Sequence, residues 1–173
     1  MAKPTLRKVA TLSHFVARAM KAIAPAAADE EREARFEAIC AKPFTRERIR
    51  ERLCGVRESV VLSIALRELR RELMLALIGR NASGACGYDE VVATMTCFAE
   101  EAIRVAVSVH ARELAERWGV PMSAEGVPQD LLVVGMGKLG GAELNVSSDI
   151  DLIFLYGEDG ETRPTPEFPN VRR

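Results

Sequence analysis

Several features that define other classes of protein are scarce in this chain of 173 residues. It has only four cysteines, Cys40, Cys54, Cys86 and Cys97, which form no CxxC motif, and only two histidines. This pattern argues against a zinc site or a redox pair and favours idle thiols in a reducing cytosol, so we expect a cytoplasmic protein. No apolar run approaches the roughly 18 residues of a membrane span, so we expect no membrane partner.

The chain also lacks an excess of charge of either sign. Its 24 basic and 25 acidic residues leave a net charge of −1. Such a balance gives no global field for attracting nucleic acid, so we expect no nucleic-acid partner. Apolar residues make up 48% of the chain, which is enough to build the buried core of about one domain. Specific partners therefore have to be inferred from local motifs.

The first 28 residues contain five cations and no acidic side chain. Apolar residues recur there at helical spacing, namely Leu6, Val9, Leu12, Val16, Ala19 and Ile23. The segment superficially resembles an organelle transit peptide. An acidic run, DEERE, follows directly, and there is no long serine-rich, acid-poor leader, so we favour a docking helix.

Three further helices are predicted before residue 120. Thr45 is a candidate N-cap for a short helix that ends near Gly55. Apolar residues then recur at spacings of mostly three and four from Val60 to Ile78, and again from about Asp89 to Trp118. Both stretches predict amphipathic helices, and the second is long enough to brace another domain.

The composition changes after the polar turn MSAEGVPQ. The runs LLVVGM and IDLIFLY predict two strands, and the proline-containing tail from Gly157 onward predicts irregular structure. We therefore predict an α+β protein with a mostly helical region at residues 1–120 and the beginning of a second domain at residues 121–173.

The segment GMGKLGGAELNVSSDIDLIFLY supports two competing interpretations. Gly135, Gly137 and Gly140 match the glycine fingerprint of a dinucleotide-binding turn. That fold needs a full crossover helix before its second strand, whereas only GAELNVSS separates Gly140 from Asp149. The ATP-binding loop GxxxxGK[ST] does not fit, because glycine and alanine follow Gly140. A dinucleotide-binding domain remains the less favoured alternative.

Asp149 and Asp151 support the second interpretation, a metal site. Side chains two residues apart in a strand project from one face, with Cα atoms about 6.6 Å apart, so these carboxylates can converge. Two close carboxylates repel, and a divalent cation removes that cost. Magnesium prefers oxygen ligands and the phosphates of a nucleotide. We therefore predict that Asp149 and Asp151 bind Mg²⁺ and are catalytic in transfer at phosphorus.

The glycine turn supplies the other half of this predicted site, because glycine lets backbone N–H groups approach a phosphate closely. The predicted nucleotide- and phosphate-binding residues are Gly137, Lys138, Gly140, Gly141, Ser147 and Ser148. In a simpler interpretation, SSD is a turn and DID opens a strand with solvated acids. The glycine turn before DID and the apolar strand after it make this less favoured, since acids beside a buried strand need a positive partner.

The same segment resembles the signature of the bifunctional glutamine synthetase adenylyltransferase/adenylyl-removing enzymes, which belong to the polymerase-β-like nucleotidyltransferase superfamily. The resemblance is most specific over residues 131–156, where Gly137, Lys138, Asp149 and Asp151 occupy the superfamily's motif positions. A weaker likeness extends back through LRELRRELMLALIGR and the long helix. The resemblance implies that residues 121–173 begin a nucleotidyltransferase catalytic domain with a mixed sheet.

The family resemblance also implies a function. Its members remove AMP from a tyrosine of glutamine synthetase by phosphorolysis, releasing ADP, or attach AMP from ATP, and a PII signalling protein and glutamine regulate them. The sequences GMGKLGG and ELNVSSDIDLIF, which follow a helical region, resemble the adenylyl-removing half of these enzymes. The superfamily's third carboxylate lies on a later strand, so we expect a truncated catalytic domain. The alternative is a catalytically inert module that binds glutamine synthetase or a PII protein.

Overall fold

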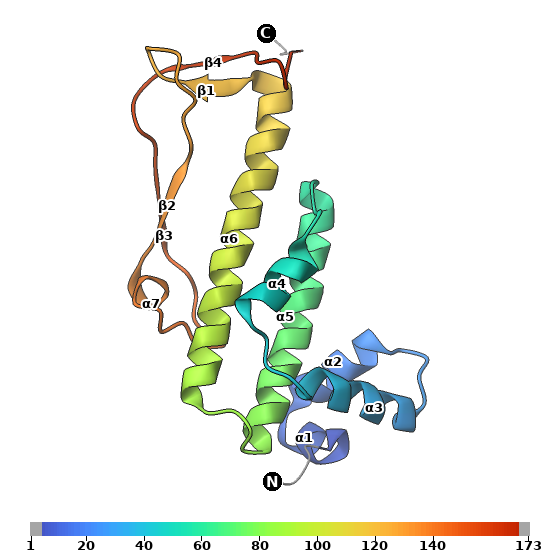
Figure 1. The fold of residues 1–173 in the computed structure, drawn as a ribbon. Helices are drawn as coiled ribbons and strands as arrows, with labels where there is room; N and C mark the ends of the chain where they lie inside the picture. Colours follow the sequence, from blue (N-terminus) through green and yellow to red (C-terminus); the bar gives the residue numbers. More distant parts are fainter. Residues whose placement is uncertain (1–4, 170–173) are drawn as a thin grey trace.

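Two long helices form the frame of the protein, seen in a computed structural model that describes residues 5–169. Helices α5 (Ser59–Ala82) and α6 (Tyr88–Trp118) lie side by side and run in opposite directions (Figure 1). At about 1.5 Å per residue, the 31 residues of α6 extend over roughly 46 Å. The two helices predicted from apolar spacing are confirmed. All of the strands follow α6 in the chain.

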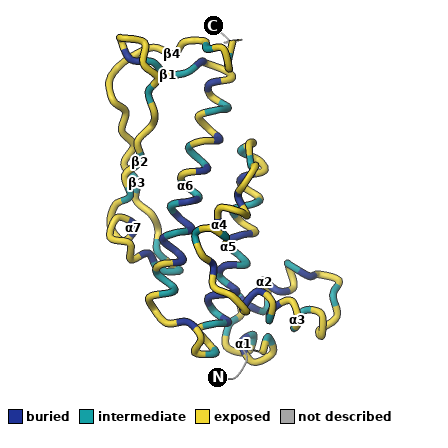
Figure 2. The backbone as a smooth tube through the Cα atoms, viewed as in Figure 1, coloured by how far each residue is buried: buried dark blue, intermediate teal, exposed yellow. Residues whose placement is uncertain are grey.

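Each long helix buries one apolar face. The buried side chains include Leu62, Leu69 and Leu73 on α5 and Phe98, Val105 and Val109 on α6. Removing a side chain of this size from water stabilises the fold by about 1.5–3 kcal/mol. The core therefore follows the α5–α6 contact and continues into the helical chain before residue 54, where Phe36 and Ile49 are buried. Figure 2 shows burial concentrated where the helices meet.

Helix α4 (Arg46–Leu53) packs against both long helices. The Thr45 side chain accepts a hydrogen bond from the Arg48 N–H at 3.3 Å, which confirms the predicted N-cap. Ile49 and Leu53 are buried against the core. The helix ends before Gly55, whose φ of 77° lies in the left-handed region.

The amino-terminal segment forms two helices, whereas the sequence predicted one. Helices α1 (Leu6–Leu12) and α2 (His14–Ile23) meet at Ser13, which is extended and accepts a hydrogen bond from the Val16 N–H. The prediction of one continuous helix is wrong because this serine caps a new helix. The next helix, α3 (Asp29–Cys40), begins with the acidic run and packs against α5.

Four short strands form two antiparallel pairs. Strands β2 (Leu132–Gly135) and β3 (Leu152–Leu155) pair in a register that places Gly135 opposite Leu152. Strands β1 (Val120–Met122) and β4 (Glu161–Arg163) pair at the carboxyl end of α6 (Figure 1). The helical majority and small sheets confirm the α+β class, but β4 corrects the prediction that the tail is irregular.

The β2–β3 ribbon is largely exposed, in contrast to the helices (Figure 2). The Phe154 side chain on β3 is 58% exposed, and Leu132 and Ile153 are exposed too. The expectation of a buried strand beside the aspartates is therefore wrong for residues 5–169, because two strands alone provide no second layer to cover their faces. Within the same range, every helix falls short of the combination of length and apolar character that a membrane span requires.

A buried carboxylate links α4 to α6. The Glu101 side chain is 1% exposed and accepts hydrogen bonds from Arg46 at 2.9 Å, Arg50 at 3.0 Å and Arg104 at 2.8 Å. Burial acts to raise the pKa of Glu101, but hydrogen bonds from Arg50, Arg104 and Arg46 outweigh it and hold the pKa at about 2. The carboxylate is therefore ionised whenever the protein is folded near neutral pH.

We expect the free energy of unfolding to decrease as the pH is lowered from about 4.5 to 2. A carboxyl group with a lowered folded-state pKa stabilises the fold fully above its unfolded pKa of about 4.3, and this contribution disappears as the pH falls to its folded value. For Glu101 the contribution is about 3 kcal/mol. Urea unfolding at a series of acidic pH values measures it.

Other carboxylates act in the same direction, because the pKa values of Glu47 and Glu125 are also lowered, chiefly by hydrogen bonds from their own backbone N–H groups. The difference between the wild-type protein and Glu101→Gln isolates the contribution of Glu101. Parallel pH profiles for the two proteins would contradict the assignment.

Candidate functional site

The glycine turn and the predicted catalytic aspartates meet at one end of the β2–β3 ribbon. The Met136 N–H donates a hydrogen bond to the Asp151 carbonyl at 2.9 Å, next to the Gly135–Leu152 pair. Asp151 thus lies beside the residue that precedes helix α7 (Gly137–Gly140), as the path of the chain shows (Figure 1). Asp149 and Asp151 are exposed and precede β3, which begins at Leu152, two residues after the predicted start at Ile150. Neither aspartate therefore lies within a strand, and the prediction that the two project from one strand face is wrong, because β3 pairs with β2 only from Leu152 onward.

The turn itself is a single tight helical turn. Gly137 has a φ of 54°, in the left-handed region that glycine tolerates. The Gly140 N–H bonds to the Met136 carbonyl at 3.2 Å, and the Gly141 N–H bonds to the Gly137 carbonyl at 3.0 Å. Leu139 is buried in the core, whereas Lys138 is exposed. The turn is therefore anchored on one side and presents its lysine to solvent.

Replacing Gly140 with alanine is expected to displace this turn. A Cβ atom at Gly140 would lie 2.5 Å from the Gly135 carbonyl oxygen, so the backbone of the turn or of β2 would have to shift. We expect a loss of about 1–3 kcal/mol in the free energy of unfolding. Gly141→Ala is the matched control, because its φ is −82° and a Cβ there meets nothing closer than the Gly137 oxygen at 3.5 Å. Equal unfolding midpoints for the two variants would refute this account.

Asn145 organises the chain between the turn and the aspartates. Its Oδ1 atom accepts hydrogen bonds from the Ser147 N–H at 3.1 Å, the Ser147 hydroxyl at 3.2 Å and the Ser148 hydroxyl at 2.8 Å. Both predicted phosphate-binding serines are thus gathered around one side-chain oxygen. Asn145 was not predicted, although asparagine is a known signal for a turn in which its side chain binds the backbone two residues on.

Helix α6 holds this segment in place. The Leu144 N–H donates a hydrogen bond to the Thr96 hydroxyl at 3.2 Å, and both residues are buried. Thr96 lies in the first half of α6 and was not predicted, because a single threonine in an amphipathic helix shows no functional pattern. The segment from the turn to the aspartates is therefore fixed to the helical core at Leu139 and Leu144.

A cleft of about 470 Å³ separates α6 from the turn. Gly135, Leu139 and Gly140 line one side of it, and Glu100 and Arg104 provide charged groups from α6. The glycine turn thus borders an accessible cavity that contains a positive side chain. Asp149 and Asp151 do not line this cleft.

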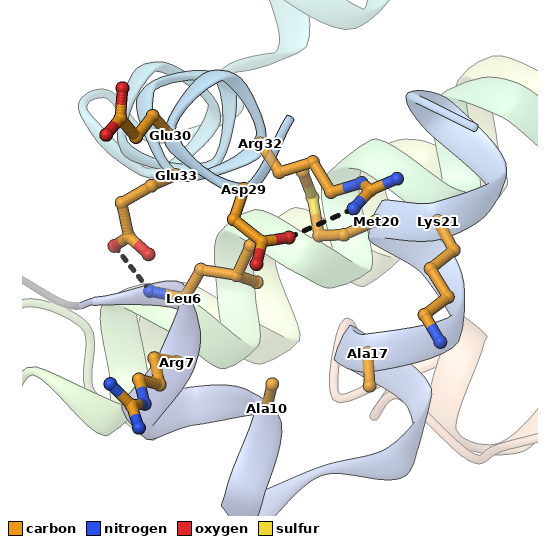
Figure 3. A pocket seen from close by; sticks show the side chains of 10 residues that line it. All are labelled: Leu6, Arg7, Ala10, Ala17, Met20, Lys21, Asp29, Glu30, Arg32 and Glu33. Atoms are coloured by element: carbon orange, nitrogen blue, oxygen red, sulfur yellow. Dashed lines mark hydrogen bonds and ion pairs between the residues drawn. The ribbon is translucent and has the colours of Figure 1, made fainter. Parts of the chain in front are cut away.

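A second cleft, of about 710 Å³, lies among α1, α2 and α3, apart from the β2–β3 ribbon (Figures 1 and 3). Figure 3 shows that the Leu6 N–H of α1 bonds to Glu33 of α3 and that Arg32 pairs with Asp29 within α3. Its charged residues are three cations, Arg7, Lys21 and Arg32, and three carboxylates, Asp29, Glu30 and Glu33. The charges of this cleft balance, and it holds none of the predicted site residues.

The donor set at the aspartates suits a hard cation in part. Magnesium bound with a nucleotide takes one or two protein carboxylates and completes its shell with phosphate and water oxygens. Asp149 and Asp151 offer that number of carboxylates. Over residues 5–169, His, Cys, Asp and Glu side chains nowhere gather in a group of three or more that could hold a metal. A dedicated, all-protein metal cage is therefore absent from this range.

The dinucleotide alternative does not agree with the fold. Dinucleotide-binding turns join parallel strands through a full crossover helix. Strands β2 and β3 are antiparallel, and α7 has four residues. The glycines of this turn therefore serve a hairpin-like connection and not a dinucleotide-binding unit.

Comparison with known proteins adds a family assignment. Residues 4–168 match the family model described as glutamate-ammonia ligase adenylyltransferase. The chain is 56% identical over 106 residues to a protein of Ralstonia nicotianae and 45% identical over 157 residues to one of Burkholderia mallei, covering 61% and 87% of this chain. A protein of Nitrosomonas eutropha is 40% identical over 135 residues, covering 74% of the chain.

All three relatives are named bifunctional glutamine synthetase adenylyltransferase/adenylyl-removing enzyme. The chain spans only 11% to 16% of their length. The similarity therefore concerns one segment of much longer proteins.

Proposed function

The chain belongs to the glutamate-ammonia ligase adenylyltransferase family, and from this membership we propose that it is part of an enzyme that transfers AMP to or from a tyrosine of glutamine synthetase. Within that activity we propose adenylyl removal, in which orthophosphate attacks the phosphorus of the AMP–tyrosine bond. The new bond gives ADP, and the tyrosine oxygen leaves and takes up a proton.

We propose that Asp149 and Asp151 hold Mg²⁺ for this reaction, where the cation would neutralise charge on the phosphate oxygens. Phosphate would be positioned by the backbone of Gly137, Gly140 and Gly141 together with Lys138. Ser147 and Ser148, which Asn145 holds, would bind beside it. The hydrogen bond between Met136 and the Asp151 carbonyl is the observation that carries this proposal, because it keeps one aspartate next to the turn.

The proposed division of labour follows the change of secondary structure after α6. Residues 121–173 would begin the nucleotidyltransferase domain, and residues 1–120 would form a helical region that supports it. We propose a cytoplasmic protein with glutamine synthetase as its protein substrate and a PII protein as regulator in the longer enzyme. ATP or ADP would be the nucleotide, and neither nucleic acid nor membrane would be a partner.

A chimera tests this function. The aligned 157-residue segment of the Burkholderia mallei relative is replaced with the matching residues of this chain. Phosphate-dependent release of ADP from adenylylated glutamine synthetase is then measured with Mg²⁺ and with a chelator. Activity that depends on both phosphate and Mg²⁺ supports the proposal, whereas a folded chimera without activity beside an active parent contradicts it.

A second candidate function applies to the 173-residue chain by itself. Asp149 and Asp151 are exposed, and no third acidic, histidine or cysteine side chain joins them within residues 5–169. On this ground we propose that the chain alone binds glutamine synthetase or a PII protein without turnover. We expect no ADP release by the purified chain, and titration calorimetry with glutamine synthetase measures whether binding persists.

A further inference from the structure

The buried Glu101 carboxylate orients two arginines whose remaining donors face a cleft. Arg50 donates only its Nε–H to Glu101, whereas Arg104 contacts Glu101 through its Nε–H and one Nη group. Their other guanidinium N–H groups have no acceptor in the described part of the chain, and the two side chains are 51% and 56% exposed. Arg46 differs, since it is bonded to both Glu100 and Glu101. Arg50 and Arg104 are therefore held in position with donors to spare.

Arg50 and Arg104 both line a cleft of about 650 Å³ between α4, α6 and the chain around β1. Arg57 and Arg112 line the same cleft, and Ser108 adds a hydroxyl group. Two carboxylates, Asp130 and Glu167, also lie on its wall. Four arginines against two acids distinguish this cavity from the balanced cleft among α1, α2 and α3 (Figure 3).

We propose that this arginine-lined cleft binds a phosphate-bearing small molecule. A guanidinium group presents a planar fork of donors that matches phosphate oxygens, and such charge-assisted hydrogen bonds are stronger than neutral ones. Because Glu101 fixes the Nε ends of Arg50 and Arg104, less conformational freedom is lost when a ligand binds. The ligand class follows from the four arginines that line the cleft, since phosphate oxygens accept from such forks.

The position of Arg104 relates this cleft to the glycine turn. Arg104 lines both the arginine-lined cleft and the neighbouring cleft bordered by Gly135 and Gly140. The proposed site contains neither Asp149 nor Asp151, so it stands independently of the metal-dependent transfer proposed above.

Titration calorimetry of the 173-residue chain with pyrophosphate, in the presence of a chelator, tests the proposal. We expect binding that weakens about tenfold in the double variant Arg57→Gln/Arg112→Gln, because each change removes a charged donor without touching Glu101. Arg67→Gln is the matched control, since Arg67 is an exposed arginine of α5 whose hydrogen bonds go to Ser63. It should leave the affinity unchanged.

Two more arms complete the test. Arg104→Gln should also weaken pyrophosphate binding, and circular dichroism of that variant verifies that the helices remain folded. Citrate serves as a carboxylate probe. No pyrophosphate binding, equal loss in the Arg67 control, or preference for citrate would each overturn the proposal. Asp149→Asn should leave this affinity unchanged, so failure of the proposed transfer reaction and failure of this site give different results.

Discussion

Glu101→Gln is expected to lower the free energy of unfolding by about 3–5 kcal/mol, the usual effect of removing one partner of a buried ion pair. The change leaves Arg46, Arg50 and Arg104 converging on a neutral amide that can accept fewer hydrogen bonds. Their mutual repulsion then acts at the contact between α4 and α6. Urea unfolding followed by circular dichroism at neutral pH measures the loss.

Glu100→Gln is the matched control for this prediction. Glu100 is the preceding residue of α6 and also pairs with Arg46, but its side chain is 41% exposed. Half-exposed ion pairs contribute about 0–1 kcal/mol, so this variant should unfold close to the wild-type midpoint. If the two variants lost equal stability, the burial of Glu101 would not be the cause.

The neighbouring pair Glu100 and Glu101 also shows why the sequence could not predict this cluster. Apolar spacing predicted α6 closely, because one side of the helix has to face the core. The same spacing does not say which glutamate faces α4, since that depends on how α4 crosses α6. A charge inside a helix interface is therefore fixed by packing and not by local pattern.

Local signals predicted those elements whose partners are near in sequence. The cap at Thr45 and the strands around Val133 and Phe154 required only side-chain preferences and short-range order. Strand β4 was missed because its partner β1 lies some forty residues away, from Val120 opposite Arg163. The break at Ser13 was missed because its apolar neighbours continue the helical spacing on both sides.

The sequence indicated which residues to consider for the candidate site, but not how they are arranged in space. The spacing of the glycines and of Asp149 and Asp151 indicated that a turn and a carboxylate pair belong together. Pairing of β2 with β3 then placed Asp151 beside Met136. Thr96 acts through one hydrogen bond to the distant Leu144, and Asn145 acts through three hydrogen bonds from the nearby Ser147 and Ser148. Neither kind of contact leaves a periodic pattern in a sequence.

Asp149→Asn and Asp151→Asn, each introduced into the Burkholderia mallei chimera, are expected to reduce phosphate-dependent ADP release by about a thousandfold. An amide keeps the size of the side chain but removes the negative charge that a divalent cation requires of its ligand. The described structure shows no side-chain hydrogen bond or ion pair for either residue, so each variant should unfold at the wild-type temperature.

Asp159→Asn provides the control for charge alone. Asp159 lies between β3 and β4, is exposed, and accepts a hydrogen bond from the Tyr156 hydroxyl at 3.0 Å. Its replacement removes one negative charge from the same domain without touching the proposed ligands, so ADP release should stay within about twofold of the parent chimera. If Asp149→Asn or Asp151→Asn weakens metal binding, a higher Mg²⁺ concentration should partly restore the activity of that variant. A sample that contains a chelator should show no such recovery. Full activity of either variant would show that the two carboxylates are solvated acids at the start of a strand, and the proposed transfer chemistry would then need another pair of ligands.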